Sequence, residues 1–254
     1  MNNENFRSEI KQLADDVRFQ WSRKGVTDVF DVLDQIAILI RSPYQTSGRN
    51  KMFDGFSTYI NKHLVVYINS GYTLGRERFS AAHELYHLTY DKEVLMSKKV
   101  LDDDEENEKR ADTFAVEFLM PEEGVRDYYH NEIFYKLQPK HIVRLQHRFQ
   151  VSYRAMLKRL RDLGLCSQPE FEELEKFGFI DYADYLKELT IKEGFSLALI
   201  TPSNIISIPH RYIEMFKDNY ESGNISYSKY SSLLKLINKT PQDYGFQVPK
   251  SEEI

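Results

Sequence analysis

The sequence predicts an α+β fold, in which a domain with a small sheet and long helices is followed by a helical module and a smaller carboxy-terminal region. Three short segments near the amino terminus, 37–42, 54–60 and 63–70, are rich in β-branched and aromatic residues and bounded by turn formers. Most of the remaining chain places apolar residues at helical spacing. The 254 residues, 41% hydrophobic and 29% charged, suffice for one large or two modest domains with buried cores.

Helices are expected on both sides of the three strands. Residues 5–24 carry apolar positions at steps of four, three and four, which predicts a helix with one buried stripe, and 28–35 fit a second, short helix. After the strands, 71–90 gain Ala and Leu at helical spacing, which predicts a long, largely buried helix. The segment 101–121 opens with an acidic run that suits a helix amino terminus, and we expect its helix to end before Pro121.

The second half of the chain is predicted to be mainly helical. Between 139 and 165 we expect two helices in the outline shared by helix-turn-helix units, with Ser152 capping the second. Residues 168–200 combine an acidic helix with an apolar run. Residues 209–239 again have helical spacing, and the core candidates there are Ile225, Tyr230, Leu234 and Ile237.

These patterns divide the chain into three parts. We expect the first domain at 1–125, the helical, helix-turn-helix-like module at 126–167, and a region for regulation or substrate recognition at 168–254. The single cysteine, Cys166, excludes an internal disulfide and a cysteine-rich zinc site, and it suits a reducing compartment. No apolar run approaches the roughly 20 residues of a membrane helix, and the amino terminus lacks the features of a secretory signal. We therefore expect a cytoplasmic protein.

Residues 83–87 form an HExxH motif on the predicted long helix. The spacing of four puts His83 and His87 one turn apart on the same face, so both imidazoles can reach one metal ion. Neutral imidazole suits zinc, and Glu84 lies where it can take a proton from a bound water. The motif therefore predicts a metal site with its catalytic base. The alternative is a pair of hydrogen-bonded histidines on a buried helix.

A catalytic zinc site also needs a third protein ligand. Glu108 and Asp112 lie one turn apart on the next predicted helix, and small residues on both helices would allow a close approach. We expect Glu108 to be the third ligand and Asp112 to orient a ligating histidine, which is a zincin-like arrangement. The alternatives are a helix-start carboxylate for Glu108 and an ordinary exposed aspartate for Asp112. These ligands suit Mn²⁺ as well as Zn²⁺.

Two linked motifs, RERFSAAHELYH and EKRADTFAVEFLMP, resemble the RxxFxxAHELxH and ExxAxxFAxxLLMP of the ImmA/IrrE-type metallopeptidases. The resemblance covers roughly residues 28–124, and 139–165 look like the helical part that follows in that family. It implies a zinc-dependent intracellular endopeptidase of the gluzincin kind, which cleaves a helix-turn-helix repressor. In this family Glu84 would activate water, and the metal ligands would be His83, His87 and Glu108.

The segment 139–165 contains seven cationic side chains and one carboxylate, in a chain whose net charge is -5. One interpretation is contact with DNA or with a partner protein. The residues concerned are Arg144, Arg148, Arg154, Lys158 and Arg159. The alternative, which we favour over DNA contact, is a solvated helical face or one paired with the acidic stretch 170–175.

Three functional hypotheses follow from these observations. The first is hydrolysis of a protein substrate that relieves repression in stress, mobile-element or phage regulation. The second is a non-proteolytic regulatory adaptor with a structural zinc site, which binds a repressor or DNA. The third is a peptidase that becomes active only when a signal reaches 168–254. The change Glu84→Gln separates the first two, because a binding protein tolerates it and a peptidase does not.

Overall fold

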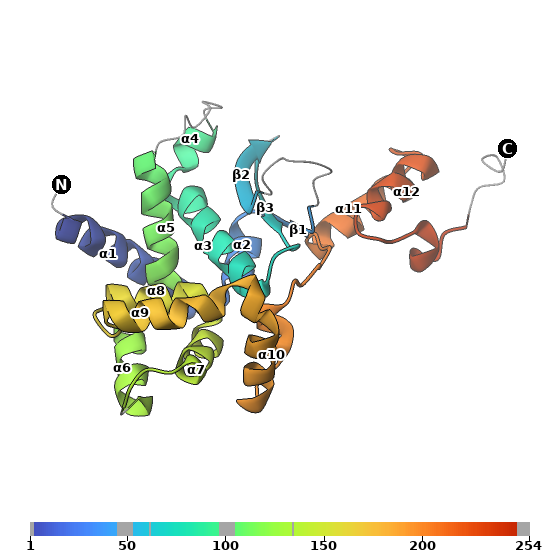
Figure 1. The fold of residues 1–254 in the computed structure, drawn as a ribbon. Helices are drawn as coiled ribbons and strands as arrows, with labels where there is room; N and C mark the ends of the chain where they lie inside the picture. Colours follow the sequence, from blue (N-terminus) through green and yellow to red (C-terminus); the bar gives the residue numbers. More distant parts are fainter. Residues whose placement is uncertain (1–2, 45–52, 61, 97–104, 134, 248–254) are drawn as a thin grey trace.

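The computed structural model describes residues 3–44, 53–60, 62–96, 105–133 and 135–247, and it confirms the α+β class (Figure 1). Part of the predicted acidic run, residues 101–104, lies outside these ranges. The helices of the first part are α1 (Asn3–Ser22), α2 (Val29–Ile36), α3 (Leu74–Tyr90), α4 (Lys92–Met96) and α5 (Glu105–Leu119). The predicted end of the last helix before Pro121 is therefore confirmed.

The three predicted strands form one sheet in the order β1-β3-β2. Their bounds are Ile38–Ser42 for β1, Gly55–Ile60 for β2 and His63–Asn69 for β3. The central strand β3 is parallel to β1 and antiparallel to β2, so that Val66 pairs with Leu39 on one side and with Ser57 on the other. Strand β2 is consequently an edge of the sheet.

Helix α3 packs between the sheet and α5. At Gly55, a Cβ atom would lie 2.8 Å from the Tyr67 carbonyl oxygen and 3.5 Å from Cγ of Glu84. The first distance is too short for a real Cβ atom, so the glycine allows β2 to lie close to β3, and the second is an ordinary van der Waals contact between β2 and α3. On the opposite side, the small residues Ala81 and Ala111 are fully buried, which permits the expected close approach of α3 and α5.

A helical module follows, with α6 (Glu122–Glu132), α7 (Pro139–Phe149) and α8 (Tyr153–Asp162). The predicted cap is present, because Ser152 Oγ accepts a hydrogen bond from the Ala155 amide at 3.2 Å. The turn between α7 and α8 lies against the first turn of α3 at Gly75, where a Cβ atom would come within 2.7 Å of the Val151 backbone. The module is thus packed directly on the helix that bears the HExxH motif.

The last part of the chain has two sections. The first contains α9 (Gln168–Glu175), η1 (Lys176–Gly178), η2 (Ile180–Tyr182), α10 (Ala183–Lys192) and η3 (Leu197–Ile200). The second contains α11 (His210–Glu221), α12 (Tyr227–Lys235) and η4 (Pro241–Tyr244), and it lies at the opposite end of the molecule from α1 (Figure 1). Its own small core is formed by the predicted residues Tyr230, Leu234 and Ile237, with Ile225 packed against them.

Candidate metal centre

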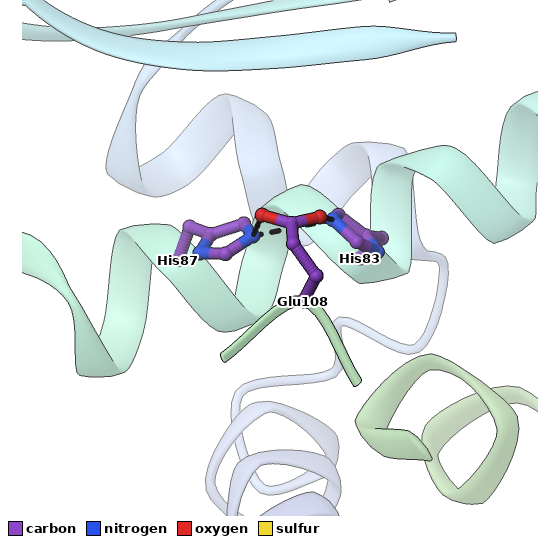
Figure 2. A group of neighbouring side chains, drawn as sticks. All are labelled: His83, His87 and Glu108. Atoms are coloured by element: carbon purple, nitrogen blue, oxygen red, sulfur yellow. Dashed lines mark hydrogen bonds and ion pairs between the residues drawn. The ribbon is translucent and has the colours of Figure 1, made fainter. Parts of the chain in front are cut away.

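Three side chains from two helices converge at one point. His83 and His87 extend from α3, and Glu108 extends from the first turn of α5 so that its carboxylate lies between the two imidazole rings (Figure 2). The two Nε2 atoms are 3.2 Å apart. Glu108 Oε2 is 3.2 Å from Nε2 of His83, and Oε1 is 3.5 Å from Nε2 of His87.

These distances fit a single ion. Tetrahedral ligands at the usual zinc–nitrogen and zinc–oxygen bond lengths lie roughly 3.3–3.5 Å from one another. The three measured separations, 3.2, 3.2 and 3.5 Å, match this requirement before any side chain moves. The Glu108 side chain is 52% exposed, so the centre opens to solvent on the α5 side.

Carboxylates hold the other nitrogen of each imidazole. Nδ1 of His83 lies 2.9 Å from Asp112 Oδ1, and Nδ1 of His87 lies 2.6 Å from Asp91 Oδ2. An Nδ1–H that donates to a carboxylate leaves Nε2 with its lone pair free for a metal. Asn107 Nδ2 donates to Asp91 at 2.8 Å and holds that carboxylate in place. The structure thus brings Asp112 within hydrogen-bonding distance of His83, the contact that an orienting role would require.

We did not predict a role for Asp91 from the sequence, although its spacing from His87 indicated one. Asp91 follows His87 by four residues, immediately after the end of α3, and so lies one turn further along the same face.

The charge around His83 favours its protonated form. Burial alone would lower the pKa of His83, but the hydrogen bond with Asp112 and the negative charges of Glu84, Asp112 and Glu108 together raise it above the ordinary value. A divalent cation bound at this point would neutralise the negative charge of these carboxylates. The electrostatics of the centre therefore fit a bound cation as well as its distances do.

Glu84 is buried between α3 and β2, with 6% of its surface exposed. Ser57, on β2, donates its hydroxyl to Glu84 Oε2 at 2.6 Å. Burial raises the pKa of Glu84 above its ordinary value, although the hydrogen bond from Ser57 and the nearby histidines act in the other direction. A carboxylate of raised basicity is suited to accept a proton. Ser57 was not predicted, because its contact depends on the long-range placement of β2 over α3.

The structure corrects the expectation for Arg159. This residue is 1% exposed, and its guanidinium donates to both carboxylate oxygens of Glu117 at 2.7 and 2.6 Å. Its Nε donates to the Met120 carbonyl at 3.0 Å. A guanidinium that is buried and held by three hydrogen bonds within the protein is unable to contact a phosphate, so Arg159 instead ties α8 to α5.

The other four predicted basic residues are spread over different surroundings. Arg144 donates to Glu193 at 2.5 Å, and Arg154 forms an ion pair with Glu175 at 3.5 Å. The second of these pairs supports the alternative in which the basic segment is matched by the acidic stretch 170–175. The two remaining residues, Arg148 and Lys158, are exposed.

Comparison with known protein families agrees with this geometry. The family model of the IrrE N-terminal-like domain, peptidase family M78, matches residues 35–161, which is half of the chain. The chain belongs to this family. The matched range includes the HExxH helix α3, the Glu108 helix α5 and the module up to α8. The resemblance predicted from the two motifs is thereby confirmed, and the M78 domain identifies the chain as a member of a peptidase family.

No match was found among curated proteins. Within the described residues, no helix combines the length and the apolar character needed to span a bilayer.

Proposed function

We propose that this protein is a metal-dependent endopeptidase that cleaves a helix-turn-helix transcriptional repressor and so relieves repression in stress, mobile-element or phage regulation. The main support is the convergence of three ligand atoms beside the buried carboxylate of Glu84, within a domain of the M78 peptidase family. The choice of substrate is supported by the resemblance to the ImmA/IrrE-type enzymes. Zinc suits the ligand set best, and manganese is the alternative.

In this proposal His83, His87 and Glu108 are the metal ligands. A divalent ion bound there would polarise the scissile carbonyl and lower the pKa of a water molecule. Asp112 and Asp91 hold the two imidazoles so that both Nε2 atoms face the shared point.

Glu84 is the proposed general base. Ser57 holds its Oε2, so we assign proton exchange to Oε1. Glu84 would accept the proton of the attacking water and then deliver it to the leaving amine, which is the usual double role of a catalytic carboxylate. Its burial supports this role, because the raised pKa makes the carboxylate a better proton acceptor.

The test is intact-mass spectrometry of the helix-turn-helix repressor encoded nearest to this chain, after incubation with the protein and Zn²⁺ or Mn²⁺. Wild type should yield two fragments whose masses add up to the repressor plus one water. Glu84→Gln and a chelator-treated wild type should leave the repressor intact. An intact repressor in every sample would contradict the proposed substrate.

The non-proteolytic adaptor makes a different prediction. If regulation of the repressor in cells survives Glu84→Gln, the protein acts by binding, and the proposed peptidase role is wrong.

A further inference from the structure

A groove of about 1150 Å³ lies beside the proposed metal centre. Its lining includes residues of α3 and α5 and residues of α8, η2, α10 and η3. Its volume exceeds the roughly 300–1,000 Å³ that is typical of pockets for small molecules. Such a groove has room for a stretch of polypeptide.

The groove is lined by direct neighbours of the proposed metal ligands and of the proposed base, although none of those four residues lines it itself. Asp112 lines it and contacts His83, whose other ring nitrogen belongs to the metal centre. Asp54 also lines it and directly precedes Gly55, the residue that lies against Glu84. A polypeptide in the groove would therefore be separated from the ligands and from the base by single intervening residues.

Apolar side chains are exposed along the groove. Phe79 and Val116, half-buried on α3 and α5, belong to the wall next to the metal centre. Phe179 and Ile180, which follow α9 in the chain and also line the groove, are 44% and 85% exposed. Large apolar residues gathered in one concave surface mark a binding site more often than scattered ones do. We therefore expect the groove to receive apolar side chains.

The groove is also positively charged, in contrast to the chain as a whole. Among the described residues, seven cationic side chains and three carboxylates line it, and five of these cations are paired with carboxylates: Arg7, Arg76, Arg154, Arg159 and Lys187. Asp54 is bonded to Arg76, and Asp112 is bonded to His83. Lys109 and Lys158 are exposed and form no ion pair with any described residue. The charge that remains for a ligand is therefore positive, and it would attract carboxylates.

We propose that this groove binds a segment of the protein substrate that combines apolar and acidic residues, next to the scissile bond. This inference rests on the proposed peptidase function and adds its substrate preference. Phe179 and Ile180 lie outside the family-matched range 35–161. In this proposal, residues beyond the family-matched range contribute to the choice of substrate.

The test measures binding separately from cleavage. The full chain with Glu84→Gln, loaded with zinc, is titrated against two fluorescein-labelled 12-residue peptides followed by fluorescence anisotropy. One peptide combines Phe, Leu and Glu, and the other has Lys at every Glu position. The acidic peptide should bind at least about tenfold more tightly at low salt, and the difference should shrink as salt screens the charges. Equal affinities would overturn the proposal.

Two matched pairs of variants locate the site. The double change Lys109→Glu with Lys158→Glu should weaken acidic-peptide binding about tenfold or more. The same charge change at Lys229 and Lys235, exposed on α12 and outside the groove lining, should leave binding within about twofold. An equal effect of the two double variants would show a non-specific response to net charge and would overturn the proposal.

The second pair tests the apolar contact. Ile180→Ser should weaken binding several-fold, whereas Ile191→Ser should not, because Ile191 is 61% exposed but does not line the groove. Unchanged binding by Ile180→Ser would contradict the assigned contact.

Failure of the peptidase proposal would look different. If the peptidase proposal is wrong, wild-type protein will leave the repressor uncut, while the peptide affinities will still follow the pattern predicted above. Failure of the groove proposal would appear as unaltered affinities in the groove variants while wild type still cuts the repressor.

Discussion

Replacing Arg159 by Met would remove one partner of the buried ion pair with Glu117. The pair is bidentate, and the side chains of Arg159 and Glu117 are 0% and 3% exposed. Removal of one member of such a pair leaves an uncompensated buried charge, which costs about 3–5 kcal/mol. Arg7, whose Nε is 3.5 Å from Glu117 Oε1, compensates part of that charge, so we expect a value near the lower end. For a chain of this size the loss corresponds to a decrease in Tm of roughly 6–20 °C.

Urea unfolding, followed by the fluorescence of the single tryptophan Trp21 and by circular dichroism, measures this loss. Lys158→Met is the control, because Lys158 is exposed on the same helix and its replacement should change stability by less than about 0.5 kcal/mol. A double variant, Arg159→Met with Glu117→Leu, should recover much of the loss. The reasoning is refuted if Arg159→Met loses less than about 1 kcal/mol. Loss of DNA binding at unchanged stability would instead restore the DNA-contact interpretation.

Three further experiments test other parts of the structure. Asp91→Ala and Asp112→Ala should each weaken zinc affinity by about 10- to 100-fold in competition with a chromophoric chelator, and unchanged affinity would contradict the orienting role. Burial raises the pKa of the Cys166 thiol to about 11. DTNB should therefore label this thiol slowly in the folded protein at pH 8 and quickly in urea, and fast labelling of the folded protein would contradict the burial of Cys166. Gly75→Ala should destabilise the chain by about 1–3 kcal/mol in urea unfolding, because Cβ would meet the Val151 backbone; wild-type stability would contradict that contact.

Local spacing predicted the parts of the site that depend on a single helix. His83 and His87 converge because residues four positions apart lie about one turn apart on the same face of a helix. Asp91, four positions after His87, lies on the same face one turn further along. Glu108 required the additional expectation that α3 and α5 pack closely, which the small residues in both helices indicated. Ser57 lies 27 residues before Glu84, and its contact arises only when the edge strand is placed over α3.

Arg159 shows why the pattern of charged residues predicted the surroundings of a side chain less well than helical spacing did. In the sequence it belongs to a run of cations on a helix, and such runs are usually solvated. Its partner Glu117 is 42 residues away, on a helix whose pattern predicts a buried face. Only the packing of α8 on α5 brings the two together, so local sequence contained no signal of the pair. The groove has the same origin, because its walls come from segments far apart in the chain.

The most direct test of the proposed metal centre measures metal content and hydrolysis together in Glu84→Gln and His83→Ala. Glu84→Gln should retain about one equivalent of zinc and lose hydrolysis of the repressor by about 10²- to 10⁴-fold, since it removes the base and keeps the ligands. His83→Ala should lose both the zinc and the hydrolysis. A Glu84→Gln protein that cuts at the wild-type rate, or a His83→Ala protein with a full equivalent of zinc, would contradict the roles proposed for these residues.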